Sequence, residues 1–448
     1  MAAVVTASAE DFPLTFRTIP AKDVMAFPGG SGTYGQVGVA RPAKLRKEPK
    51  AISRHPLYGV CRESPTGPVF LFRLDEAKGD RKGYDQLIVD MNQNGDLTDD
   101  PLVQRAVLPT DRKTGSSDQM LFGPIQAPPE KALAGGRPVY FAQVYLFNRQ
   151  ALIGDRADQN SMLGQLMLKA GWYLEATVAL DGQKQRVGVY DSDSNLHLGD
   201  VSRSMTFTNR TEISWYFRPG DTWLVGADGA SGFENDVFQS KACAFGPILY
   251  LGAKAYKVAL APDCKTLRVE PWTEALAEVA LQPRGDQVRS LVLAWQQPGG
   301  QWQLIRPAVT GGKAMLPPGS YRLHSCNLFG ESGPRDQVMV SGMQRVPQTP
   351  VSIAVGKANT LACGAPLEIK VTTEKTRAAL RGQLAEDTGD AKVDSDSVVR
   401  INANVAGAGG EVYSTFQKGE GFRSRPPKPS FTIAQGGRTV ASGNLEFG

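Results

Sequence analysis

Short segments in which apolar and polar residues alternate recur along this chain, and they constrain its fold more than any other feature. Residues 172–180 alternate in this way, an Asp181-Gly182 pair follows, and a second apolar alternation begins at Val187. Alternation with a period of two is typical of a strand that buries one face, and Asp-Gly between two such segments favours a tight turn. The sequence therefore predicts a β-hairpin here.

The same alternation returns towards the C-terminus, at residues 367–372, 399–405 and 431–445, with a Gly436-Gly437 turn inside the last segment. The 48 glycines and 30 prolines punctuate the chain as expected for many short strands joined by turns. We therefore expect a mainly β fold built from several β-sandwich-like modules.

Helical periodicity is scarce. Two segments are expected to form short helices, Ser161–Ala170 with a serine at its start and Glu274–Leu281. Both would be small additions to a β protein.

A length of 448 residues predicts roughly two to four domains, because a domain usually holds ~100–200 residues. Stretches rich in proline and glycine at 123–136 and 262–271 mark candidate boundaries. We expect a β domain at 1–130, a second β domain at 131–270, a third module at 271–355 and a C-terminal β module at 356–448.

The net charge of +5 is small for this length, and the basic residues are scattered except for one cluster: Lys44, Arg46, Lys47, Lys50 and Arg54. The cluster lacks interleaved aromatic residues, so we interpret it as a solvated loop and expect no nucleic-acid partner. No apolar run approaches the ~18 residues of a membrane-spanning helix, so we expect no membrane span.

The first nine residues are small and apolar, and Ala7-Ser8-Ala9 before Glu10 matches the cleavage pattern of signal peptidase. A charged segment and a full apolar segment are missing before it, which leaves a shortened start or coincidence as alternatives. We expect an extracytoplasmic protein, periplasmic, at the cell surface or secreted.

The five cysteines, at positions 61, 243, 264, 326 and 363, show neither a CxxC pair nor metal-ligand spacing, so no zinc site is expected. Two interpretations stay open. In an oxidising compartment Cys243 would pair with Cys264 and Cys326 with Cys363. Alternatively, all five are separate buried thiols.

The strongest chemical signal is the acidic and amide-rich segment 90–100, which follows the strand-like residues 87–89. Calcium binds about six to eight hard oxygens, and a loop offers them from positions 1, 3 and 5 around a glycine at position 6. Asp90, Asn92, Asn94 and Gly95 occupy these positions. Position 12 is Pro101 instead of glutamate, so a helix-loop-helix EF-hand is not expected. The alternative is an Asx-rich turn without metal.

This segment resembles the DxDxDG loops of dockerins, thrombospondin repeats and many exported bacterial proteins, in which two flanking helices are not needed. The resemblance covers residues 90–100 and implies calcium as the cofactor. The candidate metal ligands are Asp90, Asn92, Asn94, Asp96, Asp99 and Asp100.

A second and weaker candidate loop follows residues 187–190, and Leu196 stands there in place of the glycine. Its candidate metal ligands are Asp191, Asp193, Asn195 and Asp200. A third echo is Gly226–Gly229 with Glu234 and Asp236. A strand followed by an acidic loop three times indicates a duplicated β unit within residues 1–270.

From about residue 275 the sequence changes in style. The segment 316–323, Leu-Pro-Pro-Gly-Ser-Tyr-Arg-Leu, places a proline-glycine turn before a strand led by an aromatic residue. It resembles the immunoglobulin-like or transthyretin-like modules of secreted proteins, and the resemblance implies such a fold for the C-terminal modules.

Other motifs carry no function. Residues 30–37 match the glycine-rich loop of kinases, but no V-A-I-K, H-R-D or D-F-G follows. The three histidines are far apart, and neither G-x-S-x-G nor H-E-x-x-H occurs.

Two functions stay open. The first is a non-enzymatic calcium-binding β protein with a structural or binding role, whose partner would be a protein or glycan at the cell surface. The alternative is a secreted hydrolase acting on carbohydrate, with paired carboxylates in a cleft and accessory β modules. A pocket that holds close carboxylates of shifted pKa would favour the hydrolase, and flat faces would favour the scaffold.

Overall fold

The fold was obtained as a computed structural model. It describes residues 9–25, 27, 32–62, 67–79, 83–106, 118–147, 162–180, 182–208, 213–218, 220–227, 242–297, 299–330, 338–344, 348–377, 397–418 and 430–444. Residues 1–8, with most of the expected cleavage pattern, and residues 228–241, with most of the third acidic echo, lie outside these ranges.

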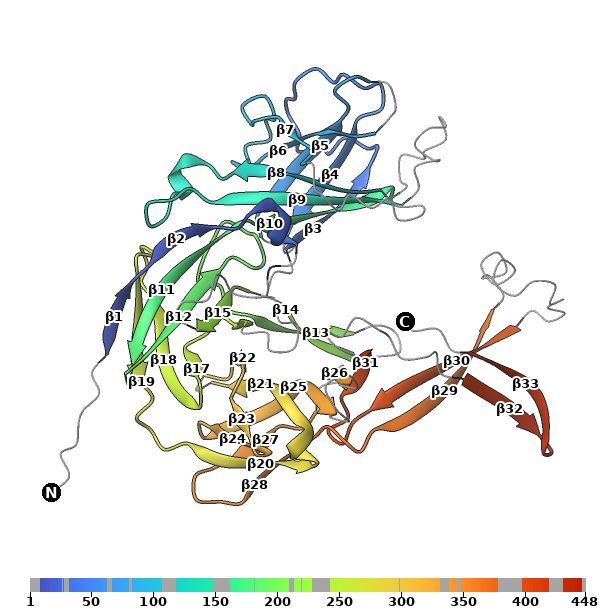
Figure 1. The fold of residues 1–448 in the computed structure, drawn as a ribbon. Coiled ribbons are helices and arrows are strands. Elements are labelled where there is room, and N and C mark those ends of the chain that lie inside the picture. Colours follow the sequence, from blue (N-terminus) through green and yellow to red (C-terminus); the bar gives the residue numbers. More distant parts are fainter. Residues whose placement is uncertain are drawn as a thin grey trace. The chain divides into compact units, whose positions relative to one another are not determined.

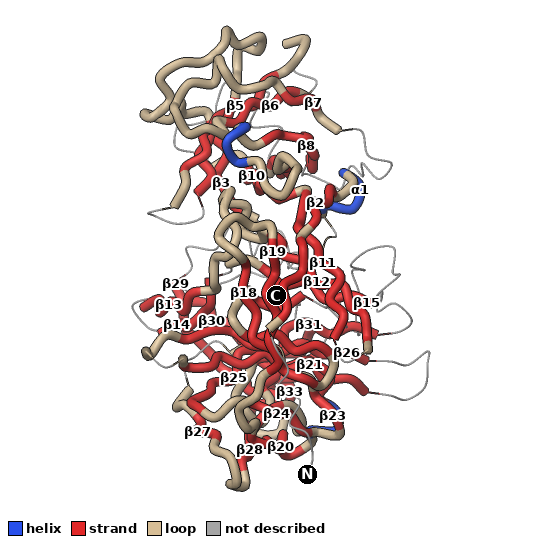
Figure 2. The backbone as a smooth tube through the Cα atoms, turned by 90° about the vertical axis from the view of Figure 1, so that its left-hand side faces the viewer, coloured by secondary structure: helices blue, strands red, loops and turns tan. Residues whose placement is uncertain are grey.

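Strands dominate the described chain (Figures 1 and 2), which confirms the mainly β fold. Helical structure within the described ranges is confined to α1 (Ala21–Val24) and the 3-10 turns η1 (Pro129–Lys131) and η2 (Gly285–Gln287). No helix in this part of the chain has the length and apolar character needed to cross a membrane.

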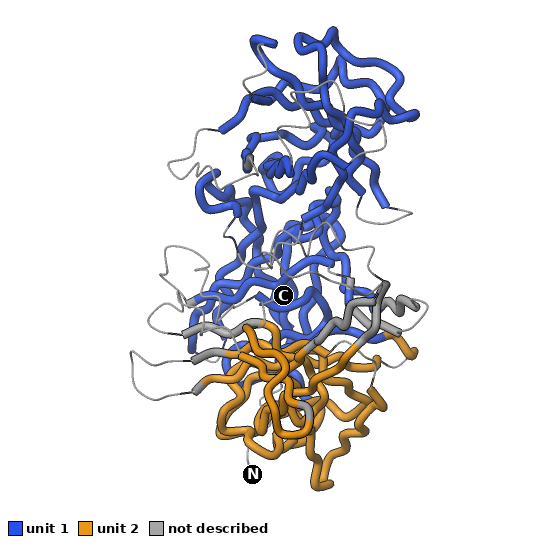
Figure 3. Tube along the Cα trace, turned by 90° about the vertical axis from the view of Figure 1, so that its right-hand side faces the viewer, with its two compact units in different colours: residues 1–205, 217–273, 302–306 blue, residues 206–216, 274–301, 307–448 orange. Residues whose placement is uncertain are grey.

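The chain divides into two compact units (Figure 3). Unit 1 comprises residues 1–205, 217–273 and 302–306, and unit 2 comprises residues 206–216, 274–301 and 307–448. The change of style that the sequence shows near residue 275 coincides with the start of the main part of unit 2.

An eight-stranded antiparallel sheet forms the first half of unit 1, in the order β7-β6-β5-β4-β3-β10-β9-β8. Its strands are β3 (Thr33–Gly38), β4 (Leu57–Arg62), β5 (Val69–Asp75), β6 (Gln86–Val89), β7 (Val103–Gln104), β8 (Asp118–Gln126), β9 (Val139–Leu146) and β10 (Gly164–Ala170). Its two edge strands meet, because Ala106 N–H donates to the Leu121 carbonyl at 2.7 Å and Arg105 bridges Phe122. This closed sheet takes strands from both sides of residues 123–136, where the sequence predicts a boundary.

Two further sheets complete unit 1, in the orders β16-β15-β12-β11-β2 and β1-β19-β18-β17. Their strands are β1 (Glu10–Pro13), β2 (Thr15–Thr18), β11 (Trp172–Leu180), β12 (Gln183–Tyr190), β15 (Thr222–Ala227), β16 (Ala242–Ala244), β17 (Ile248–Leu251), β18 (Lys254–Leu260) and β19 (Thr266–Pro271). Only Leu14 separates β1 from β2, so one stretch of chain forms an edge strand of both sheets. The short β22 (Trp302–Ile305) also belongs to unit 1, and β13 (Arg203–Thr208) pairs with β14 (Ile213–Arg218).

The predicted hairpin is confirmed: β11 pairs with β12 from Leu174–Val189 to Leu180–Gln183. Gly182 has φ +75°, a left-handed conformation that glycine adopts at little cost. One continuous apolar core then joins the closed sheet to both other sheets of unit 1, with Phe72, Trp172 and Trp223 among its almost fully buried members.

Unit 2 contains sheets with the orders β23-β24-β20-β28 and β21-β25-β26-β31-β30-β29. Their strands are β20 (Ala277–Pro283), β21 (Val288–Gln296), β23 (Val309–Thr310), β24 (Lys313–Leu316), β25 (Gly319–Gly330), β26 (Val338–Met343), β28 (Asn359–Cys363), β29 (Glu368–Arg377), β30 (Ser397–Ala406) and β31 (Val412–Lys418). A short β27 (Val351–Ile353) pairs with β25, and β32 (Ser430–Gln435) with β33 (Arg438–Asn444) forms a hairpin.

Both expected helices are wrong. Residues 164–170 form β10, a central strand of the closed sheet that is buried from Leu166 to Ala170 on both faces. Its apolar run, residues 166–168, is typical of a strand buried on both faces, and periodicity does not distinguish such a run from a buried helix. Residues 277–283 form β20, in which Ala277, Val279 and Leu281 are buried, the period-two pattern of a strand.

Candidate metal centre

The second acidic loop, residues 191–200, begins where β12 ends at Tyr190. Asp191 Oδ1 accepts the Asn195 N–H at 3.1 Å, and Asn195 Oδ1 accepts the His197 N–H at 2.8 Å. Leu196 has φ +71°, and its side chain is buried in the core of unit 1. The residue in the glycine position therefore anchors the loop, because its apolar side chain offsets the backbone strain.

Asp221, just before β15, faces this loop from a position thirty residues after Asp191. Its Oδ2 accepts the N–H groups of Gly199 at 2.6 Å and Asp200 at 2.9 Å, and its own N–H donates to the Asp200 carbonyl at 2.7 Å. Gly220 makes this approach possible, because a Cβ there would lie 2.3 Å from the Asp200 carbonyl oxygen.

Three carboxylates converge in this way. Asp191, Asp193 and Asp221 are 0%, 3% and 1% exposed, and each places one oxygen within 4.8 Å of those of the other two. Asp221 Oδ1 is buried and has no hydrogen-bond partner. Within the described residues, no lysine or arginine forms an ion pair with Asp191 or Asp221. Buried carboxylates without a counter-charge are costly, so the cluster is suited to a cation.

The electrostatics of the cluster agree with its geometry. Burial raises the pKa of Asp191 to about 6, against the hydrogen bonds that its carboxylate receives. The pKa of Asp221 is raised well above its ordinary value, first by burial and then by the Asp191 and Asp193 carboxylates. Burial and the neighbouring carboxylates therefore both act on Asp221, and a single divalent ion would relieve both causes.

The closed sheet holds the acidic loop in place through side chains and backbone. Tyr140 on β9 donates its hydroxyl hydrogen to Asp191 Oδ2 at 2.6 Å, and Thr33 on β3 donates to the Asp193 carbonyl at 2.5 Å. The Ala170 N–H at the end of β10 donates to Ser194 Oγ at 2.9 Å. The loop thus joins the closed sheet to the sheet that contains β12 and β15.

Asn195 and Asp200, the other predicted ligands of this loop, lie beside the three carboxylates. The Asn195 side-chain nitrogen donates to Asp200 Oδ2 at 2.7 Å and to Asp193 Oδ2 at 3.2 Å. The structure therefore brings all four predicted residues of the second loop together and adds Asp221. No sequence motif identifies Asp221, although Gly220-Asp221 directly before an apolar strand is the available signal.

The first acidic loop, residues 90–100, closes on itself. Asp90 is 1% exposed, and its two carboxylate oxygens accept the N–H groups of Asn94 at 3.0 Å and Gly95 at 2.9 Å. Asn94 Oδ1 accepts the Asp96 N–H at 2.7 Å. The same bonds between residues 1 and 5 and between residues 5 and 7 occur in the second loop. Calcium loops and metal-free Asx turns share such bonds, so calcium at this loop stays a prediction.

The remaining acids of the first loop have partners of their own. Lys47 Nζ donates to Asp96 Oδ2 at 2.9 Å, and hydrogen bonds from Thr98 and Lys47 lower the pKa of Asp96 to about 2. Asp99 Oδ2 accepts the side-chain nitrogens of Asn92 at 3.2 Å and Asn94 at 2.8 Å. Asp96 thus has a cation as its partner and Asp99 has amide donors, whereas Asp221 Oδ1 in the second cluster has no hydrogen-bond partner.

Asp100 is the exception. Its Oδ1 accepts the Met91 N–H at 3.2 Å, while its Oδ2 is buried without a hydrogen-bond partner. Burial raises the pKa of Asp100 to about 7.

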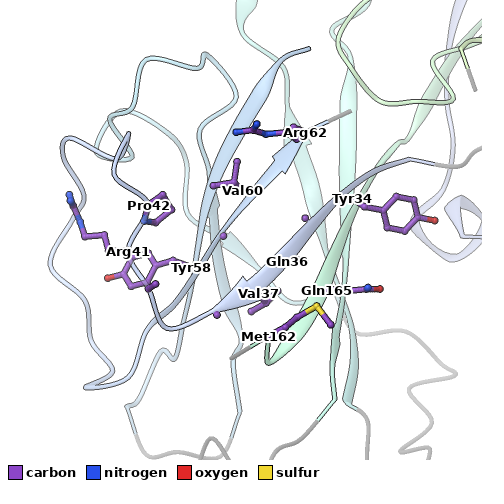
Figure 4. A pocket seen from close by; sticks show the side chains of 14 residues that line it. Tyr34, Gln36, Val37, Arg41, Pro42, Tyr58, Val60, Arg62, Met162 and Gln165 are labelled. Carbon is purple, nitrogen blue, oxygen red and sulfur yellow. The ribbon is translucent and has the colours of Figure 1, made fainter. Parts of the chain in front are cut away.

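A separate pocket of about 660 Å³ lies along β3 (Figure 4). Arg62 and Val60 of β4 lie on one side of that strand, and Met162 and Gln165 lie on the other. The residues that line the pocket include no aspartate or glutamate. The paired carboxylates that a glycoside hydrolase needs are therefore not found in this pocket.

Comparison with known proteins adds no assignment. No family model, curated protein or solved structure matches this chain.

Proposed function

We propose that this chain is a calcium-binding β protein with a structural or binding role, in which the ion binds at Asp191, Asp193 and Asp221. The observation that carries the proposal is the convergence of three buried carboxylates. Among them, Asp221 Oδ1 is buried without a hydrogen-bond partner. Burial against the interior of unit 1 means that water cannot solvate these charges, so an ion is the simplest source of compensation.

The donor set favours a hard cation. The cluster offers carboxylate oxygens, with the amide of Asn195 and the carboxylate of Asp200 adjacent to it. Oxygen ligands of this kind suit calcium, whereas zinc and copper sites usually include histidine or cysteine.

An ion here would act mainly on stability. Asp191 and Asp193 lie in the loop after β12, Asp221 precedes β15, and Tyr140 ties Asp191 to β9. Three segments distant in sequence therefore meet around the proposed ion, and its binding free energy would add to the free energy of unfolding of unit 1.

An extracytoplasmic location suits this proposal, because weak calcium sites are typical of extracellular modules. The Ala7-Ser8-Ala9 pattern is the sequence support for export. In a binding role, the partner of this chain would be a protein or a glycan at the cell surface.

The alternative, a secreted hydrolase acting on carbohydrate, has less support. The two carboxyl groups of raised pKa, Asp191 and Asp221, are almost fully buried, and the pocket along β3 is lined without carboxylates. We therefore propose a non-enzymatic role.

Titration calorimetry of the metal-stripped protein with calcium tests the proposal. We expect saturable heat with a dissociation constant of about 10⁻³ M or below. Asp221→Asn should remove the event assigned to the buried cluster, and Asp90→Asn tests the first loop separately. Absence of heat in the parent protein, or heat that Asp221→Asn leaves unchanged, would contradict the assignment.

A further inference from the structure

Cys326 and Cys363 lie on different sheets of unit 2. Cys326 is in β25, which pairs with β21 and β26, and Cys363 is the last residue of β28, which pairs with β20. Both cysteines are 0% exposed. Both side chains therefore lie in the interior of unit 2.

The two sheets are in direct contact at this place. A Cβ built on Gly364, the residue after β28, would lie 2.9 Å from the Leu328 side chain of β25 and 3.6 Å from Val288 of β21. The Cys326 and Cys363 side chains are hydrogen-bonded to each other. Two thiols in hydrogen-bonding contact are close to the arrangement from which a disulfide forms.

The other cysteines have different neighbours. The Cys243 thiol donates to the Trp223 carbonyl at 3.8 Å, and the Cys61 thiol donates to the Leu166 carbonyl at 4.0 Å. Of the two pairings that the sequence left open, only Cys326 with Cys363 is therefore supported by a contact between the thiols. All five cysteines are free in this structure.

We propose that Cys326 and Cys363 are a modification site at which an oxidising environment forms a disulfide between the two sheets of unit 2. With glutathione disulfide as the oxidant, one protein thiolate attacks it and releases one glutathione. The second protein thiolate then attacks the mixed disulfide and releases another. The two protein sulfurs are oxidised, glutathione disulfide is reduced to two glutathione molecules, and the two thiol protons pass to the released glutathione thiolates.

The residues around Cys326 and Cys363 indicate under which conditions the disulfide forms. The Tyr413 hydroxyl donates to Glu411 Oε1 at 2.8 Å, and Glu411 is 0% exposed beside the thiols. The pKa of Cys326 is raised, first by its hydrogen bond with Cys363, then by burial, and further by the Glu411 carboxylate. Thiolates are the reactive species, so the folded reduced protein should oxidise slowly, whereas a folding chain should oxidise readily.

Refolding the reduced chain in a glutathione redox buffer, followed by alkylation and non-reducing peptide mapping, tests the proposal. We expect a peptide that links Cys326 to Cys363, three alkylated cysteines, and a melting temperature several degrees above that of the reduced protein. The double variant Cys243→Ser/Cys264→Ser is the matched control and should form the same link.

Two further measurements keep the test decisive. Cys363→Ala leaves four cysteines, and all four should be alkylated in the peptide map, with no gain in melting temperature on oxidation. If that variant does not fold, the parent protein still gives the answer through the linked peptide. Links of Cys326 or Cys363 to other cysteines, or thiols that stay free after refolding in the oxidised buffer, would overturn the proposal. None of these outcomes depends on calcium binding.

Discussion

The hydroxyl of Tyr140 donates a hydrogen bond of 2.6 Å to Asp191 Oδ2, and both side chains are 0% exposed. This bond joins β9 of the closed sheet to the loop after β12. The same carboxylate belongs to the cluster with Asp193 and Asp221. Tyr140 therefore positions one of the three proposed calcium ligands while satisfying part of its hydrogen-bonding capacity.

Tyr140→Phe should lower the free energy of unfolding by about 1–3 kcal/mol, because it leaves a buried carboxylate oxygen without its donor. Tyr190→Phe is the matched control, since the Tyr190 hydroxyl donates to the uncharged Ala170 carbonyl at 2.9 Å. Its cost should be about 0.5–1.5 kcal/mol. Urea denaturation measures both variants, and a smaller loss for Tyr140→Phe would contradict the role given to this bond.

The variant Asp221→Asn should show whether Asp221 is a metal ligand or only accepts hydrogen bonds from the backbone. An asparagine oxygen can still accept the N–H groups of Gly199 and Asp200, while one of the three buried carboxyl groups is removed. In EDTA the variant should be at least as stable as the parent protein. With calcium at ten to a hundred times its dissociation constant, the parent should gain ~1.4–2.7 kcal/mol and the variant should gain little.

Thermal melts with EDTA and with calcium measure this difference. Asp263→Asn, at an exposed aspartate that forms an ion pair with Lys265 at 3.8 Å, is the control and should respond as the parent does. A variant that is much less stable in EDTA, with an undiminished calcium response, would show that Asp221 serves only its two backbone donors.

Gly95→Ala should destabilise unit 1 more than Gly182→Ala. Both glycines have a left-handed backbone, with φ +76° and +75°, so both changes carry a strain of about 1–2 kcal/mol. A Cβ at Gly95 would lie 2.6 Å from the Lys44 carbonyl oxygen, whereas none of the described atoms lies within 4 Å of one at Gly182. Gly95→Ala should therefore cost at least ~1 kcal/mol more in urea denaturation. Equal costs would mean that the segment at Lys44 does not pack on the first acidic loop.

Acid should destabilise unit 2 through His324 on β25. Burial lowers the pKa of His324 from 6.5 to about 4. Between pH 6.5 and pH 4 His324 therefore binds a proton in the unfolded chain but stays neutral in the folded chain. The free energy of unfolding falls as the pH drops through this range, by up to about 3 kcal/mol. His324→Gln should reduce this fall. Urea denaturation between pH 7 and pH 4.5 measures it, and identical pH profiles for the parent and the variant would refute the prediction.

The sequence predicted those parts of the fold in which local pattern and tertiary environment agree. The 172–190 hairpin was predictable because apolar residues alternate along β11, where Leu174, Ala176 and Val178 are almost fully buried, and because Gly182 fits the turn. The strand at β29 was also predictable, although Ile369 and Val371 are 71% and 60% exposed. Closure of the eight-stranded sheet was not, because it depends on the pairing of residues 105–106 with 121–122, a long-range contact without a local signal.

The residues of the candidate site likewise fall into those that the sequence predicted and one that it did not. Spacing within one loop identified Asp191, Asp193, Asn195 and Asp200, because a short loop brings its own residues together. Asp221 was missed, since only the pairing of β12 with β15 carries it to that loop. Sequence spacing also ranked the Asp90 loop first, whereas the partners of its acids, such as Lys47 for Asp96, became visible only in three dimensions.

The number of calcium ions bound per chain tests the central claim most directly. Native mass spectrometry of the metal-stripped protein, titrated with calcium, should show that Asp221→Asn retains one ion fewer than the parent, while Asp263→Asn retains the same number. An equal number of ions in Asp221→Asn and the parent, or no bound ion in the parent, would contradict a calcium site at Asp191, Asp193 and Asp221.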